Sequence, residues 1–348
     1  MSIISFIIPV YNGEKYLQRM LDSILYQNVS TDLYEIILVD DCSFDHSVEI
    51  IERYKSTFTN IKILKNKINS KVGTTCNNGL KEAIKDSKGY IWIMGQDDEL
   101  EPNILSEVIK KISLDDLDVF LFNFRKIDSN NNHLLNYYNY GDWNCKSGIE
   151  FIKDNLYDKF IYCLSGYTWQ SVIKKNIIIE NNLCFPEKSM YEDTTFLMKA
   201  VIYSKRVAST SKIYYNYRCH NDSLVHTYSS KGNIIYEFAF IVGNELEECA
   251  SLVKKEDISI SQIIKKRAIL YYNNFILPLI LTSIEEKRSF YRLIRNNYEF
   301  INSKKIYLNK ISRLLLSLLG FYISVFMKPF YMVKKKIKKI FIHNNNKI

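Results

Sequence analysis

The pattern of apolar and polar positions changes regularly along the first hundred residues. Continuous apolar runs are typical of short strands that are buried on both faces of a sheet. Such runs cover residues 3–10, 35–39, 61–64 and 89–94. Between them, apolar positions recur with the spacing of one helix face over residues 17–25, 48–54 and 73–85. This alternation predicts an α/β fold, with a mostly parallel sheet and helices on both of its faces.

The rest of the chain predicts fewer strands and more helix. Further strands are expected over residues 117–124, 134–140 and 213–219, and helices over residues 148–156 and 192–203. From residue 234 onward the pattern is helical, with frequent Lys and Arg. We therefore expect two parts, an α/β domain over residues 1–230 and a helical C-terminal region over residues 231–348.

Polar side chains follow three of the predicted strands. They are Tyr11-Asn12, Asp40-Asp41 and Asp97-Asp98. The carboxyl ends of parallel strands share one edge of a sheet, where ligands bind in folds of this class. Two adjacent carboxylates there are suited to a divalent cation and the anion it carries. The alternative is a solvated turn, or acids that begin the next helix.

The charge of the chain is unevenly distributed. The net charge is +9, with −3 over residues 1–230 and +12 over residues 231–348. The apolar run 314–327 is shorter than the roughly 20 residues of a membrane span. It precedes the lysine-rich segment 334–339, which favours a surface helix anchored to an anionic membrane. A core helix followed by solvated lysines is the alternative, and no motif for nucleic-acid binding accompanies the charge.

The seven cysteines form no CxxC pair and have no zinc-ligand spacing with histidine. Such scattered thiols are typical of a reducing compartment. The chain begins with a strand and carries no basic, apolar leader. We therefore expect a cytoplasmic protein, held peripherally at the inner face of the cell membrane by its basic tail.

Four motifs in this order resemble the signature of the family 2 glycosyltransferases. They are residues 5–12 (SFIIPVYN), 39–43 (VDDCS), Asp97-Asp98 and Glu192-Asp193. The resemblance covers roughly residues 1–225. It implies the GT-A fold, which binds nucleotide-sugars, and an inverting transfer that uses Mg²⁺ or Mn²⁺.

The resemblance also implies roles for the matching residues. The nucleotide-sugar would be bound by Pro9, Tyr11, Glu14, Asp41 and Asp97, with Asp98 on the metal. Asp193 would be the catalytic base. Beyond the motifs, we expect Lys71 to contact the diphosphate, and Glu192 and Trp169 to contact or orient the acceptor. Trp169 would suit a core position equally well, and His220 is either a structural residue or a metal or diphosphate ligand.

Two positions depart from the family pattern. The acidic motif commonly has another Asp two positions before the pair, where this chain has Gly95. The third helix often carries Ala-Arg-Asn, where this chain has Thr75-Cys76-Asn77. Lys71 is the candidate to replace the missing Arg.

We expect an inverting glycosyltransferase that moves a sugar from a UDP-sugar to a hydroxyl of a lipid-linked oligosaccharide, in O-antigen or capsule synthesis. Two alternatives remain open. A polyprenyl-phosphate acceptor is already an anion and would need no base, and a non-catalytic nucleotide-sugar-binding subunit would account for Gly95 and Cys76. A nucleotidyltransferase is disfavoured because no glycine-rich basic loop follows the first strand.

Overall fold

The computed structural model describes residues 2–137, 140–156, 167–187, 192–221 and 235–269. Its centre is a sheet whose first half is parallel, as predicted. Strands lie in the order β3-β2-β1-β4, and each pair of neighbours in this half runs in the same direction. The bounds are β1 (Ile4–Val10), β2 (Tyr34–Asp40), β3 (Ile61–Lys65) and β4 (Tyr90–Ile93).

The second half of the sheet is mixed. β9 (Ser171–Lys174) runs antiparallel to both β4 and β6 (Val119–Ile127). β10 (Val207–Arg218) is parallel to β6 and antiparallel to the short strands β5 (Glu99–Leu100) and β8 (Trp143–Lys146). β7 (His133–Tyr137) forms a hairpin with β6. The α/β class is thus confirmed, and the parallel half presents the ends of β1, β2 and β4 at one edge.

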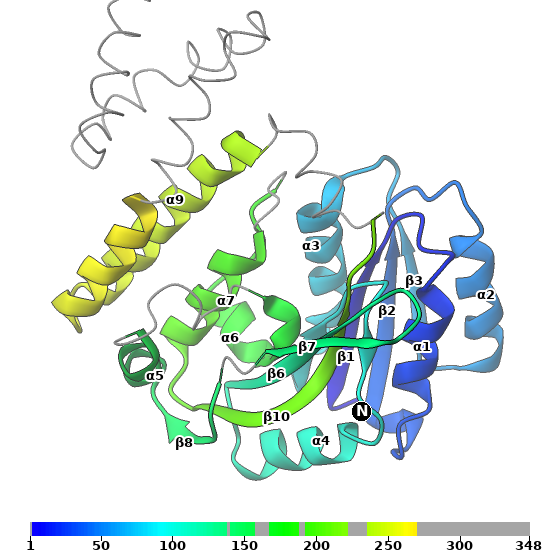
Figure 1. The fold of residues 1–348 in the computed structure, drawn as a ribbon, viewed down its shortest axis with the longest axis horizontal. Coiled ribbons are helices and arrows are strands. Elements are labelled where there is room, and N and C mark those ends of the chain that lie inside the picture. Colours follow the sequence, from blue (N-terminus) through cyan, green and yellow to red (C-terminus); the bar gives the residue numbers. More distant parts are fainter. Residues whose placement is uncertain (1, 138–139, 157–166, 188–191, 222–234, 270–348) are drawn as a thin grey trace, which may run out of the picture. The chain divides into compact units, whose positions relative to one another are not determined.

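Helices cover both faces of the parallel half (Figure 1). The even-numbered residues of β1 pack in one cluster with α1 (Leu17–Leu25), α2 (Ser47–Thr57) and α4 (Leu105–Leu114). The opposite face packs on α3 (Lys71–Ala83). A Cβ at Gly79 of α3 would lie 2.4 Å from Ile7 Cγ2, so only glycine allows this close approach of helix and sheet.

The predicted helix over residues 192–203 is confirmed as α7 (Glu192–Tyr203), and the helix over 148–156 as α5 (Gly148–Leu156). Shorter elements are α6 (Lys175–Glu180) and the 3₁₀ turns η1 (Thr31–Leu33) and η2 (Thr168–Gln170). α9 (Ile235–Val253) follows β10. Lys199 of α7 pairs with Glu245 at 2.6 Å and with Glu248 at 2.7 Å, which joins the later part of α9 to α7.

The chain divides into two compact units, residues 1–232 with 244–267 and residues 233–243 with 268–348. The basic tail and its membrane contact lie outside the described residues, and so does the rest of 270–348. A helical region over 231–348 therefore stays a prediction. Within the described part of the chain, no helix is both long enough and apolar enough to cross a membrane.

Candidate active site

The two acids of the pair at the end of β4 have different surroundings. Asp98 is 2% exposed, and its carboxylate accepts hydrogen bonds from the Tyr215 hydroxyl at 2.7 Å and the Arg218 amide at 2.8 Å. Burial, and then the charge of Asp97, raise the pKa of Asp98 well above its usual value. Asp97 is less buried, and its Oδ2 lies 2.7 Å from His220 Nε2. Asp98 therefore fixes the loop, while Asp97 remains accessible.

Gly95 is required by the position of Asp98. Its amide donates to the Tyr215 hydroxyl at 3.1 Å. A Cβ at Gly95 would lie 2.5 Å from Asp98 Oδ2 and 3.0 Å from Asp97 Oδ1. Since Asp98 is held by two hydrogen bonds, it cannot move away cheaply. The departure from the family pattern at this position is therefore a packing requirement of this loop.

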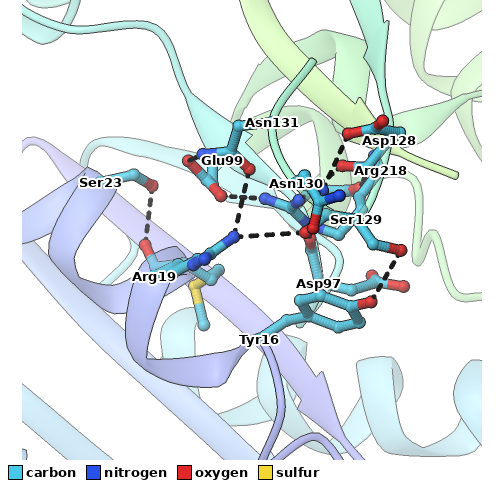
Figure 2. Close-up of polar contacts among 12 residues, drawn as sticks. Tyr16, Arg19, Ser23, Asp97, Glu99, Asp128, Ser129, Asn130, Asn131 and Arg218 are labelled. Atoms are coloured by element: carbon cyan, nitrogen blue, oxygen red, sulfur yellow. Dashed lines mark hydrogen bonds and ion pairs between the residues drawn. The ribbon is translucent and has the colours of Figure 1, made fainter. Parts of the chain in front are cut away.

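Arg218, at the end of β10, fixes the backbone of the acid pair (Figure 2). It is 1% exposed, and its Nε donates to the carbonyl of Asp97 at 2.9 Å. One terminal nitrogen donates to the Asp128 carbonyl at 2.8 Å, and the other pairs with Glu99. The guanidinium also lies over the ring of Tyr16, 4.9 Å from its centroid. A buried cation so fully bonded is rigid, and so is the Asp97 peptide.

The turn between β6 and β7 completes this cluster by contacting α1. The Tyr16 hydroxyl donates to Ser129 Oγ at 3.2 Å, and Arg19 donates to the Ser129 carbonyl and to Asn131 Oδ1, both at 3.4 Å (Figure 2). His220 also contacts this cluster, because its ring lies 4.8 Å from that of Tyr16. His220 Nδ1 is buried, and no hydrogen-bond partner for it lies among the residues that the structure describes.

Asp41, at the end of β2, holds the turn that begins α3. Its Oδ1 accepts from Asn66 Nδ2 and the Ser70 amide, both at 2.7 Å, and its Oδ2 accepts from the Lys71 amide at 3.0 Å. Lys71 has a φ of +70°, a conformation that these bonds stabilise. The same turn brings the amino-terminal end of α3 beside the end of β2. Such helix ends favour phosphate groups.

Two aromatic rings stand at the end of β1. Tyr11 is 41% exposed and meets Phe44, which is 82% exposed, edge to face at 6.1 Å. Gln96 ties this strand end to the acid pair, because its side chain accepts from the Tyr11 amide at 2.9 Å and donates to the Tyr11 carbonyl at 3.0 Å. Glu14 instead accepts from the His46 amide at 2.9 Å, and Pro9 lies within β1 beside Val39.

Trp169 belongs to a group of stacked rings, which we call the aromatic wall. Its members are Phe124, Tyr137, Tyr167, Trp169, Tyr215 and Tyr217. Trp169 stacks on Tyr215 at 4.6 Å and on Tyr217 at 5.4 Å between ring centroids. The neighbouring Thr168 hydroxyl donates to the carbonyl of Asp193 at 3.4 Å. The side chain of Glu192 lies outside the described part of the chain.

The predicted residues fall into two groups around this edge. Tyr11, Asp41 and Lys71 lie at the ends of β1 and β2, and Asp97 follows β4 in the adjoining loop. Trp169 and Asp193 lie on the other side, beyond Tyr215. Sequence reasoning missed Arg218, Tyr215 and Gln96. Tyr215 and Arg218 occupy the strand that precedes His220, and that proximity was the one signal available.

A divalent cation is compatible with the donors that this edge offers. Among the residues the structure describes, no three His, Cys, Asp or Glu side chains cluster as a metal site. Asp97 offers a carboxylate, and His220 Nε2, which donates to Asp97 in this structure, would offer its lone pair to a cation if the ring proton moved to Nδ1. Mg²⁺ is commonly bound by one or two protein groups together with substrate phosphates. The residues present therefore fit a cation that arrives with a diphosphate.

Comparison with known proteins shows what this chain resembles in sequence and fold. A family model described as Glycosyl transferase family 2 matches residues 5–175. The poly(ribitol-phosphate) beta-glucosyltransferase of Bacillus spizizenii is 26% identical over 277 residues, which are 78% of this chain and 40% of that protein. The cholesterol galactosyltransferase of Borreliella burgdorferi is 25% identical over 264 residues, 73% of this chain and 68% of that protein.

Solved structures extend the likeness to the fold. The crystal structure of S. aureus TarS 1-349 in complex with UDP-GlcNAc superposes with a TM-score of 0.56 at 21% identity. The superposition covers 86% of this chain and 92% of that one. At this level of identity the comparison shows the shared fold.

Proposed function

Because the chain belongs to the family 2 glycosyltransferases, we propose that it is an inverting enzyme that transfers a sugar from a UDP-sugar to an acceptor hydroxyl. The observation that carries the proposal is the arrangement at the strand ends. An accessible acid, Asp97, lies between a nucleotide-side group at the ends of β1 and β2 and an acceptor-side group that reaches the start of α7.

The donor would lie across the strand ends. Tyr11 and Phe44 present exposed rings to a base. Asp41 is 4% exposed and its carboxylate already accepts three hydrogen bonds, so we assign it the support of the turn beside the nucleotide, in place of the direct contact expected from the sequence. Lys71, at the start of α3, would contact the diphosphate. Pro9 and Glu14 would line the nucleotide from β1 and its turn.

We assign the metal to Asp97 with His220, in place of the Asp98 expected from the sequence. The Asp98 carboxylate is buried and already accepts two hydrogen bonds, so it has little capacity left for a cation. A bound Mg²⁺ or Mn²⁺ would offset the charge that develops on the leaving diphosphate. Arg218 would act in this reaction by holding the Asp97 peptide in place.

Transfer would occur in one displacement. Asp193 takes the proton of the acceptor hydroxyl, and the oxygen attacks the anomeric carbon from the face opposite the diphosphate. The bond from the anomeric carbon to the diphosphate oxygen breaks as the new bond forms, so the configuration inverts. Trp169 and Glu192 would orient the acceptor. A lipid-linked oligosaccharide acceptor, in O-antigen or capsule synthesis at the inner membrane face, is the finer form of this proposal.

The base assignment is tested with Asp193→Asn, which keeps the size of the side chain and removes its basicity. We expect turnover to fall by about 10²–10⁴-fold, the usual contribution of a general base, while binding of the UDP-sugar is retained. Asp86→Asn is the matched control, because Asp86 precedes β4 and lies at the opposite end of that strand from the acid pair. Full activity of Asp193→Asn would contradict the assignment and favour an acceptor that is already an anion.

A further inference from the structure

The aromatic wall joins the two sides of the proposed site. At one end, the Tyr215 hydroxyl donates to Asp98 at 2.7 Å. At the other end, Tyr167 is 40% exposed and stacks on Trp169 at 4.8 Å. The segment between them is fixed, because the Trp169 carbonyl accepts from the indole nitrogen of Trp92 at 3.0 Å and Thr168 bonds to the backbone of Asp193. An acceptor that reaches Asp193 would therefore lie along these rings.

One cation stands on this wall. Lys126 of β6 is the register partner of Tyr217 in β10, and its Nζ lies 5.9 Å from the centroid of that ring. The same Nζ lies 4.8 Å from the centroid of Tyr137 on the other side. The two rings hold the ammonium group on the face that carries Trp169.

Lys126 differs from the cations around it in having no acidic partner. Its neighbour Arg125, whose side chain points to the opposite face, pairs with Glu101 at 3.2 Å. Lys212 of β10 pairs with Glu107 at 2.5 Å. Within the described part of the chain, no carboxylate lies at ion-pair distance from Lys126. A half-buried ammonium held by rings alone keeps its capacity to bind an anion.

We propose that the acceptor on the aromatic wall carries a phosphate group, which Lys126 binds while the rings pack on the polyol or sugar beside it. This inference rests on the proposed function and specifies its acceptor as a phosphate-bearing polyol or glycan. The phosphate ester could belong to a polymer or to a lipid headgroup, and both present the same anion to Lys126. The hydroxyl that receives the sugar would lie on the residue next to this phosphate, towards Asp193.

The test compares a phosphorylated probe with its neutral counterpart. Dissociation constants for ribitol 5-phosphate and for ribitol are measured on the full chain in the presence of UDP and Mn²⁺. We expect ribitol 5-phosphate to bind the wild-type protein at least about tenfold more tightly, which corresponds to about 1.4 kcal/mol. Lys126→Met, which keeps the aliphatic stem, should reduce this preference to less than about twofold, and Lys126→Arg should restore most of it.

Lys110→Met in α4 is the matched control, because it removes the same charge from an exposed position outside the wall. It should leave the preference unchanged. The proposal is overturned if the wild-type protein does not distinguish the two probes, if Lys126→Met keeps the preference, or if Lys126→Met weakens UDP binding instead. The release of UDP from UDP-sugars is measured on the same wild-type preparation. If UDP is released but the phosphate preference is absent, the phosphate proposal fails while the proposed function stands. Equal denaturation midpoints exclude misfolding of the variants.

If the phosphate preference holds, a competition experiment distinguishes a lipid headgroup from a soluble or polymeric phosphate ester as the source of the phosphate. Vesicles of phosphatidylglycerol would compete with ribitol 5-phosphate only if a lipid headgroup reaches Lys126. Absence of competition assigns the anion to a soluble or polymeric phosphate ester, and both results agree with a phosphate site.

Discussion

Asp97 and Asp98 have different surroundings, so replacing each of them should have a different effect. Replacing Asp98 should mainly lower the stability of the fold, whereas replacing Asp97 should mainly lower the metal-dependent activity. Asp98→Ala would remove the acceptor of the Arg218 amide and of the Tyr215 hydroxyl, both of which are buried. Burial, and the charge of Asp98 after it, raise the pKa of Tyr215 well above its usual value, so this hydroxyl stays protonated and needs an acceptor. Asp97→Ala would remove only the partly exposed contact with His220.

The expected magnitudes follow from these contacts. An orphaned buried donor costs about 1–3 kcal/mol, and Asp98→Ala leaves two. Part of this cost is offset because the variant no longer buries the Asp98 carboxylate, whose charged form is disfavoured by burial, as its raised pKa shows. We therefore expect the free energy of unfolding to fall by about 2 kcal/mol for Asp98→Ala. For Asp97→Ala we expect a loss below about 1 kcal/mol, as for a weak ion pair.

The assay combines urea denaturation, followed by circular dichroism, with Mn²⁺-dependent release of UDP from a UDP-sugar. Asp97→Ala should fold nearly as stably as the wild type and lose the metal dependence. Asp98→Asn serves as the matched variant. Its amide keeps one acceptor and offers a donor to the Tyr215 oxygen, so it should be less destabilised than Asp98→Ala. The reasoning is refuted if Asp97→Ala is the less stable of the two Ala variants, or if Asp98→Ala keeps wild-type stability.

Two further predictions concern the supports of the acid pair. Gly95→Ala places a Cβ 2.5 Å from Asp98 Oδ2 and should cost about 1–3 kcal/mol in unfolding free energy, with reduced UDP release. Gly141→Ala, whose Cβ would meet its nearest neighbour at 3.4 Å, is the control, and equal denaturation midpoints for both variants would contradict the packing argument. The pKa of Asp128 lies below its usual 3.8, mainly because its carboxylate accepts hydrogen bonds from Asn132. The stabilisation by Asp128 is therefore complete above that value and lost as the pH falls through the lower folded pKa. The denaturation midpoint of Asp128→Asn should thus lie below that of wild type at neutral pH, and the gap should narrow as the pH falls below 3.8. A gap that does not depend on pH would count against the carboxylate.

The parallel half of the sheet could be predicted from the sequence because its strands are continuous apolar runs that are buried on both faces. Residues 4–10 and 34–40 form β1 and β2 close to the predicted bounds. β9, inserted between β4 and β6, was not predicted because only Val172 and Ile173 of its four residues are apolar, whereas all four residues of the equally short β4 are. α4 was not predicted either, although its apolar positions Leu105, Val108 and Ile112 do recur at helical spacing.

The candidate site shows a similar limit. The motifs point to the strand ends, but the separate environments of Asp97 and Asp98 depend on Tyr215 and Arg218, which are more than a hundred positions away in the chain. Local sequence cannot show which of two adjacent acids is buried. The same holds for Lys126, whose two rings, Tyr137 and Tyr217, come from two different strands, β7 and β10.

The most direct test of the central claim is the release of UDP from a panel of UDP-sugars, measured with Mn²⁺, after chelation with EDTA, and with Asp97→Ala. We predict release from at least one UDP-sugar with Mn²⁺, its loss on chelation and recovery when the metal is restored, and no metal-dependent release by Asp97→Ala. Release that is unaffected by chelation and by Asp97→Ala would contradict the assignment of the cation to this edge of the sheet. The lack of release from every UDP-sugar would contradict the account as a whole.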